Sequence, residues 1–416
     1  MTSTELSQSL PIDQQDERLI QAEGMRGRLR VLSRRLQGGE IGALPVVLGL
    51  VLIFVIFQAL NSYFLSSANL VDLLTQCAAI GTISIGVVLV LLVAQIDLSI
   101  GSMSGVASAV LGVGFVLHHL PLWLTMALAL VAGVVVGLIY SVAFVRFSVP
   151  SFVVTLAGLL ALLGFQLKLL GANGSINIPF SSGIVEFMQA MFVPRPFSYV
   201  LMAAVSALYL FSSLARVRRR RAHELSVPSV TGIFLRSGLL LVALEAATFY
   251  LNEDRGISAP FVLFVVLVVA MNFLLTRTAW GRSVFAVGGS VEGARRAGIN
   301  VSRVYLSVFV LCSMFAALGG LLSAGRLATA SISSGVGDTN LDAIAAAVIG
   351  GTSLFGGRGS AWSALLGIVV IESIASGLTL LNLEASVRYM ITGGVLLLAV
   401  IVDSVSRHSR AAHGRA

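Results

Sequence analysis

The chain has 416 residues, of which 57% are hydrophobic and 11% are charged, and its formal net charge is +8. Soluble globular proteins carry about 25% charged residues, so this composition excludes an ordinary soluble protein and indicates a chain that lies in a lipid bilayer. The basic residues fall in short loops between apolar runs, a distribution that is typical of membrane topology and argues against nucleic acid as a partner.

The first 40 residues are polar and are predicted to form a cytoplasmic segment. Acidic residues come first, and a group of arginines from Arg26 to Arg35 lies close to the first apolar run, which begins near Ile41. A cleavable secretory signal has an earlier apolar core. We therefore expect an uncleaved first span with the N-terminus inside the cell.

Apolar runs of membrane-spanning length fill the chain from there to about residue 405. A hydrocarbon core about 30 Å thick needs roughly 20 apolar residues per helix, and helices of this kind satisfy all their backbone groups internally. The sequence therefore predicts an all-α, polytopic transmembrane helical bundle of about 10–12 spans, forming one membrane domain over 41–405. The candidate spans are 42–60, 70–94, 98–117, 121–145, 150–170, 197–214, 232–251, 260–276, 304–325, 342–357, 361–381 and 388–403.

Some of these candidate spans are irregular. The runs 70–94 and 98–117 have almost no loop between them, and 342–357 is short and interrupted by glycines. Most arginines fall on one side of the membrane if both termini are cytoplasmic, which favours that orientation and makes 406–416 a cytoplasmic tail. The basic loop 215–231 could also bind anionic membrane lipid, because clustered arginines gain about 1 kcal/mol each near such a surface.

Polar residues interrupt the apolar sequence between the second and third runs. Gln95, Asp97, Ser99 and Ser102 lie there, beside a glycine. A helix broken at membrane depth is acceptable where it lines a cavity or is buried in protein. Two interpretations stay open: a polar break near a transport path, with these four residues facing it, and a helix N-cap at a tight turn.

Two further carboxylates, Glu245 and Glu372, fall at membrane depth, where an ionisable residue is a functional candidate. A polar seam shared with Arg236 is the alternative for Glu245, and a buried hydrogen-bonded role is the alternative for Glu372. Cys77 and Cys312 both lie in apolar spans and predict neither a disulfide framework nor a metal site.

The sequence contains no catalytic, metal-binding or cofactor-binding pattern. A loop that cradles ATP phosphates needs Gly-x-x-x-x-Gly-Lys-Ser/Thr, and the only lysine is Lys168, at the end of a span. We therefore expect a non-catalytic subunit, and any ATP-driven transport must draw on a separate subunit.

The basic segment 279–304 stands between two apolar spans. It contains Gly288-Gly289, then Glu292 and a short helix-capable piece through Ala294-Arg295-Arg296, which stops at Gly298. A glycine just past a short helix is a common C-cap. A helix this short is not stable alone in water, so we expect a partner to hold it.

Three motifs together resemble those of the membrane permease subunits of bacterial ABC importers for monosaccharides. They are IDLSIGS at 96–102, GRSVFAVGGSVEGARRAGINVSRV at 281–304 and LDAIAAAVIGGTSLFGGRGS at 341–360. The resemblance covers about residues 42–405 in the right order. Within this group, which includes the ribose and xylose permeases, the chain is most similar to the xylose type.

The resemblance implies a multi-pass protein of the bacterial cytoplasmic (inner) membrane. Two permease copies would form the pathway for a monosaccharide such as a pentose, cytoplasmic ABC ATPase subunits would drive it, and an extracytoplasmic sugar-binding protein would deliver the sugar. Residues 279–304 would be the coupling loop. Its short helix would dock on the ATPase through the residues Glu292, Ala294, Arg295, Arg296 and Gly298.

One departure from the family concerns the start of that helix. The family usually has Asn after the Gly-Gly pair, where this chain has Ser290, and serine can still cap a helix. The alternative for Arg295 and Arg296 is ordinary positive-inside topology, which alone would place arginines here.

Two other classes of function stay open. An ion-gradient-driven secondary transporter would use Glu245, Glu372 or Asp97 as an ion site, and its transport would survive loss of ATP. A membrane scaffold or receptor would show no sugar-uptake defect on deletion. The sequence does not identify the sugar, the exact ends of the spans or the residues that touch the substrate.

Overall fold

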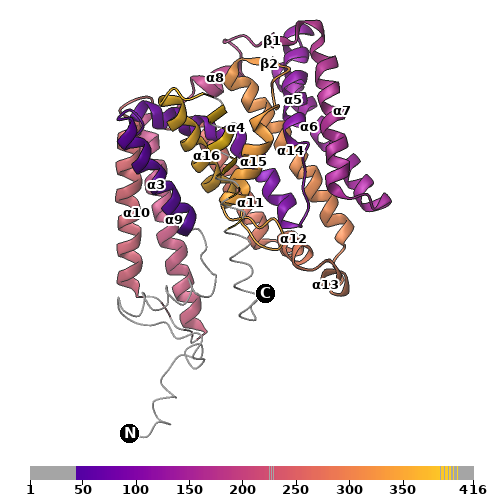
Figure 1. Ribbon diagram of the computed structural model, residues 1–416. Helices are drawn as coiled ribbons and strands as arrows, with labels where there is room; N and C mark the ends of the chain where they lie inside the picture. Colours follow the sequence, from indigo (N-terminus) through magenta and orange to yellow (C-terminus); the bar gives the residue numbers. More distant parts are fainter. Residues whose placement is uncertain are drawn as a thin grey trace, which may run out of the picture. The chain divides into compact units, whose positions relative to one another are not determined.

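The computed structural model describes residues 44–384, apart from Glu224, Ser226 and Pro228, together with scattered positions from 386 to 401. This part of the chain is almost entirely helical (Figure 1). The membrane-length helices are α4 (Ser67–Leu92), α5 with η2 (Ile100–Leu111 and Gly112–Leu117), α6 (Leu122–Phe147), α7 (Ser151–Leu170), α9 (Arg195–Ala222), α10 (Val230–Leu251), α11 (Ala259–Arg277), α14 (Val301–Leu327) and α16 (Trp362–Leu380).

Shorter elements connect these helices. They are α3 (Leu44–Leu60), η3 (Gly171–Asn173), α8 (Gly183–Gln189), α12 (Ala279–Gly289), α13 (Val291–Arg296), α15 (Asp338–Ile349) and the strands β1 (Ser175–Asn177) and β2 (Thr329–Ser331). The strands pair antiparallel, with Ile176 opposite Ala330. Figure 1 shows β1 and β2 at one end of α5, α6 and α14, and α12 and α13 at the other end.

The predicted helical bundle is confirmed within the described residues, where nine helices are long and apolar enough to cross a membrane. Each predicted span from 42–60 to 361–381 coincides with a helix, but 342–357 does not span, because α15 has only 12 residues before Gly350 ends it. The predicted segments 1–40 and 406–416 lie outside the described residues, as does most of 388–403.

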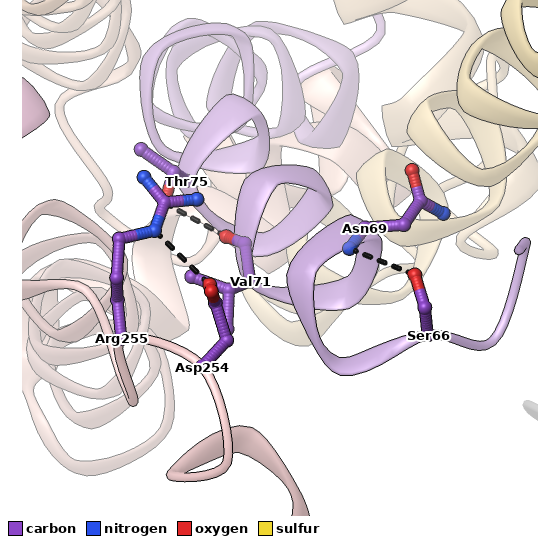
Figure 2. Close-up of polar contacts among 6 residues, drawn as sticks. All are labelled: Ser66, Asn69, Val71, Thr75, Asp254 and Arg255. Carbon is purple, nitrogen blue, oxygen red and sulfur yellow. Dashed lines mark hydrogen bonds and ion pairs between the residues drawn. The ribbon is translucent and has the colours of Figure 1, made fainter.

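Local capping explains where α4 begins. The Ser66 hydroxyl oxygen accepts a hydrogen bond from the backbone N–H of Asn69 at 3.3 Å, which satisfies one of the free donors of the first turn (Figure 2). The Thr75 hydroxyl donates a hydrogen bond to the Val71 carbonyl at 2.8 Å, so this polar side chain is satisfied within an apolar helix. The cap therefore gives the helix a defined first turn.

The core of the larger unit is α14, which packs against α4, α5 and α6. Glycines let these helices approach closely, as small residues do in membrane bundles. A Cβ added at Gly86 would lie 2.9 Å from the Cys312 carbonyl oxygen, and one at Gly137 would lie 2.7 Å from the Phe309 carbonyl oxygen. These contacts leave no room for a side chain at either position.

The described chain divides into two compact units. One consists of Val193–Ile257 and contains α9 and α10, which are joined by a hydrogen bond of 3.1 Å from Asn252 Nδ2 to Ser198 Oγ. An ion pair of 3.0 Å between Asp254 and Arg255 lies just beyond α10 (Figure 2). The other unit, Gly42–Phe192 with Ser258–Val405, holds the remaining helices.

The glycine contacts predict a position-specific effect on stability. We expect Gly137→Ala to lower the unfolding temperature of the detergent-purified protein, because overpacking a tight interface costs about 1–3 kcal/mol. The matched control is Gly164→Ala in α7, where an added Cβ meets nothing within 4 Å. Its unfolding temperature should equal or exceed that of the wild type, since alanine is the better helix former. Equal losses in the two variants would contradict the packing argument.

Candidate functional site

The chain breaks between α4 and α5 at residues 93–99, where Ala94 takes a left-handed conformation with φ of 56°. Asp97 holds this break together. Its Oδ1 accepts hydrogen bonds from the backbone N–H and the hydroxyl of Ser99, at 2.8 and 2.7 Å. Its Oδ2 receives the Cys312 thiol of α14 at 3.8 Å. The buried carboxylate thus links the break to α14.

The cap of α5 differs from the sequence expectation. Ser99 stands at the N-cap position but makes no side-chain cap hydrogen bond. Instead, Oδ1 of Asn340, at the start of α15, accepts the backbone N–H of Gly101. The backbone of Ser99 is helical, with φ of −93° and ψ of −2°, and lacks the extended conformation that is typical of a capping residue. The helix is therefore capped across the bundle, by a residue 239 positions away.

The structure brings the predicted path residues into one break but leaves most of them in packed protein. Asp97, Ser99 and Ser102 are 4%, 1% and 4% exposed. Gln95 is half-buried, and its side-chain amide donates weakly to the Val93 carbonyl at 3.4 Å. Contact of these four residues with a substrate stays a prediction.

A second break separates α15 from α16 at residues 350–361. Gly351, Gly356, Gly357 and Gly359 all have positive φ there, a conformation that residues with a Cβ rarely adopt. The loop closes on itself through Ser353 N–H and the Arg358 carbonyl, at 3.0 Å. This second break is only partly enclosed, because Gly351, Phe355 and Arg358 are exposed.

The two breaks meet α12 at a contact that we call the glycine junction, formed by Gly288, Gly356 and Gly357. The Gly357 N–H donates to the Leu92 carbonyl at the end of α4, at 2.8 Å. A Cβ added at Gly288 would overlap that same carbonyl oxygen, and one at Gly356 would lie 2.8 Å from the Gly288 carbonyl oxygen. Three segments far apart in sequence thus touch backbone to backbone.

The basic segment folds as predicted into a capped short helix. Ser290 begins α13, and its hydroxyl oxygen accepts the Gly293 N–H at 3.0 Å. Gly298, with φ of 79°, follows the helix, and its N–H donates to the Arg295 carbonyl at 3.0 Å. Serine therefore replaces the asparagine of the family pattern in the capping role.

The faces of α13 differ in burial. Ala294 is 3% exposed and packs into the core, whereas Glu292, Arg295 and Arg296 are exposed. Arg296 Nε lies 3.3 Å from Glu292 Oε1 in an ion pair one turn apart. Such an exposed pair contributes little stability, so the charged face remains available to a partner.

A polar cavity of about 840 Å³ lies among α4, α15, α16 and the end of α14. Glu372 was a candidate from the sequence, but Asn69, Asp72, Gln76 and Arg326 were not, although they also line the cavity. The missed signal is the spacing of three and four residues from Asn69 to Gln76. That spacing places all three side chains on one face of an apolar helix.

Comparison with known proteins indicates the class of molecule that this arrangement belongs to. A family model described as branched-chain amino acid transport system, permease component, matches residues 69–400. The chain is 36% identical to the xylose transport system permease protein of Escherichia coli over 83% of this chain and 86% of that protein. It is 28% identical to the ribose import permease protein of the same organism, over 86% and 92%. No solved structure matches the chain.

A third relative is the fructose import permease protein of Rhizobium meliloti. It is 29% identical over 366 residues, which cover 87% of this chain and 84% of that protein. The aligned regions of all three relatives thus extend over most of both chains.

The cap that Asn340 of α15 provides for α5 predicts that substitutions of two capping asparagines will differ in their effect on stability. Asn300 Oδ1 accepts the Arg303 N–H at 3.1 Å in an exposed cap, where water can replace it, whereas the half-buried Asn340 accepts the N–H of the buried Gly101. We expect Asn340→Ala to lower the unfolding temperature clearly more than Asn300→Ala. An unsatisfied buried N–H costs about 1–3 kcal/mol, against about 1 kcal/mol for an ordinary lost cap. A smaller effect at Asn340 would show that water enters the break.

Proposed function

The chain belongs to the family of permease components of transport systems, and on this premise we propose that it is the translocating subunit of an ATP-driven monosaccharide importer, with a pentose such as xylose as cargo. The resemblance predicted from the three sequence motifs is confirmed. The chain is a multi-pass protein of the bacterial inner membrane.

The cargo assignment rests on one observation above all, the 36% identity to a xylose transport permease over 83% of this chain. The family model is described by branched-chain amino acid transport, but the relatives reported above are named for xylose, ribose and fructose. Of the three relatives reported above, the xylose protein has the highest identity, which supports a pentose. The subunit itself is proposed to be non-catalytic.

ATP hydrolysis is proposed to occur on separate cytoplasmic subunits that bind α13. The supporting geometry is the outward face of Glu292, Arg295 and Arg296, with Ala294 anchoring the helix from below. Ser290 caps the start of α13, and Gly298 follows its end. A displacement of α13 would therefore be transmitted to α12 without unwinding either end of α13.

The glycine junction supports a route by which a displacement of α12 could reach α4 and the break before α16. Gly288 at the end of α12 is in direct contact with the Leu92 carbonyl and with Gly357. Because this contact is between backbone atoms, with no side chain between them, α12 cannot move far without moving the end of α4 and the break before α16. Asp97 and Ser99 are proposed to keep the first break intact during this motion, and Gln95 and Ser102 to lie beside the sugar path.

The remaining partners follow from the same proposal. A second copy of the chain completes the pathway, an external sugar-binding protein delivers the sugar, and anionic lipid meets the basic end of α9. The segment 279–304 faces the cytoplasm together with both termini, and the membrane domain extends over 41–405. The residues 1–40 and 406–416 are proposed to be cytoplasmic.

The function is tested by uptake in a bacterial strain that lacks the gene. We expect loss of labelled xylose uptake, restored by the wild-type gene, and no change in leucine uptake. Depletion of ATP with the ion gradient maintained should abolish the xylose uptake. Uptake that persists under those conditions would favour the ion-gradient-driven transporter. An unchanged xylose uptake in the deletion strain would remove the pentose assignment.

The coupling role is tested with a charge reversal. We expect Arg295→Glu/Arg296→Glu to release the ATPase from the detergent-purified complex, because two charges on the docking face change sign. The matched control is Arg282→Glu/Arg303→Glu, which makes the same change at exposed arginines outside α13. The ATPase should remain bound to the control. Equal retention by both double variants, with both folded, would reduce the arginines to a topology signal.

A further inference from the structure

After α14 the chain turns back along α5. Ala330 of β2 lies against Gly112, where a Cβ added to the glycine would be 2.9 Å from the alanine Cβ. Further along the chain, the Gly335 carbonyl oxygen lies where a Cβ at Gly101, near the start of α5, would have to fit. Gly112 and Gly101 are about 16 Å apart at 1.5 Å per residue. Residues 331–337, which we call the re-entrant segment, therefore run along α5 toward its first turn.

The re-entrant segment is irregular backbone inside the membrane domain. Between Ser331, the end of β2, and Asp338, the start of α15, the chain forms neither helix nor strand. Such backbone is tolerated at membrane depth where it is buried in protein or lines a cavity. One side of the segment lies on α5, and on the other side Val336 and Gly337 line the polar cavity of about 840 Å³. Open space thus adjoins the segment.

Glycines allow the segment to lie directly on α5. A Cβ at Gly105 would overlap the Ser334 carbonyl oxygen, as one at Gly101 would overlap that of Gly335. A Cβ added at Gly335 would lie 2.6 Å from the hydroxyl oxygen of Ser104, which is 2% exposed. The segment therefore covers the Ser104 hydroxyl and closes this face of α5.

One buried side chain, Gln166 of α7, fastens the segment from a neighbouring helix. Its Nε2 donates to the carbonyls of Ser331 and Ser334, both at 2.9 Å. Its Oε1 is also buried and has no hydrogen-bond partner among the described residues, which is destabilising. A side chain that only filled space would avoid this cost. The two donated bonds are therefore the contribution that this amide makes.

Both ends of the segment are held, and two glycines lie between them. The Ile332 N–H donates to the Gly174 carbonyl at 2.9 Å beside the strand pair, and Asn340 caps α5 at the other end. Gly335 and Gly337 have φ of 73° and 77°. Hinges are a few loop residues that absorb large changes in φ and ψ. These glycines allow the segment to move while its ends stay in place.

From this geometry we infer that the re-entrant segment is a gate on the β1–β2 side of the pathway and that Gln166 is the positioning residue that holds it shut. The inference rests on the proposed function and adds a named gate to it. Release of the two carbonyls lets the segment swing about Gly335 and Gly337 into the cavity. The cavity then joins the α5 face beneath, where the Ser104 hydroxyl and the Gln166 amide can each bind a sugar hydroxyl.

A thiol beneath the segment reports whether the gate opens. Ser104→Cys is a nearly isosteric change directly under Gly335. The matched control is Ser141→Cys in α6, since Ser141 is 1% exposed and, like Ser104, donates to a carbonyl of its own helix at 2.7 Å. The full chain in proteoliposomes is treated with a water-soluble methanethiosulfonate reagent. Mass spectrometry then identifies the modified residue and separates it from Cys77 and Cys312.

We expect Gln166→Met to raise the rate of modification at Ser104→Cys about tenfold, because each lost hydrogen bond shifts the balance between the closed and open segment severalfold. The rate at Ser141→Cys should not change. Gln189→Met, which removes an exposed amide bond of 2.8 Å to the Arg326 carbonyl, should alter neither rate. Methionine also removes the unpartnered Oε1, so the Gln166→Met protein should fold. A wild-type rate at Ser104→Cys in this variant, or an equal rise at Ser141→Cys, would overturn the inference.

A second measurement needs no substitution at Gln166. In the complete importer with sugar-loaded binding protein, we expect ATP to speed the modification of Ser104→Cys severalfold and to leave Ser141→Cys unchanged. An importer that takes up xylose while Ser104→Cys stays unmodified contradicts the gate and leaves the proposed function intact. An importer that hydrolyses ATP but takes up no sugar contradicts the proposed function. The comparison of Gln166→Met with the wild type needs neither sugar nor ATPase, so it tests the gate in either case.

Discussion

A backbone polar group that leaves a helix within a bilayer must find its partner in the protein, and this constraint shapes the structure at both of its breaks. At the first, Asp97 satisfies Ser99, and Asn340 caps α5 from across the bundle. At the second, Gly357 donates to the end of α4. Neither break is satisfied by its own sequence neighbourhood alone, so each depends on the other half of the chain.

This mutual dependence joins the two ends of the molecule. The residues that satisfy the breaks also connect α12 to α4 and the start of α15 to α5. The helices α4, α15 and α16 carry the polar faces of the cavity. The helix α4 thus touches α12 through backbone atoms at one end and lines the cavity toward its other end.

Local signals in the sequence predicted local structure well. Apolar length located the helices, and the run from Ser290 to Gly298 specified a helix with both caps, because a cap depends only on residues within one turn. The cavity escaped prediction because its wall comes from α4, α15 and α16, whose faces meet only after folding. The Asn340 cap could not be predicted for the same reason. Asp97 was predicted either to mark a polar break near a transport path or to cap a helix, and in the structure it links Ser99 in the break to Cys312 in α14.

The central position of α14 has a consequence for biosynthesis. Its partners α4, α5 and α6 end by Phe147, and α14 begins at Val301, so 153 residues are translated between them. At about 5–20 residues per second a ribosome needs roughly 10 to 30 s for that stretch. During this interval the early helices lie in the membrane with their buried serines and close-packing glycines unmatched. The early helices therefore meet α14 only after this delay, and an insertase or a temporary partner helix that shields those faces would raise the yield of folded protein.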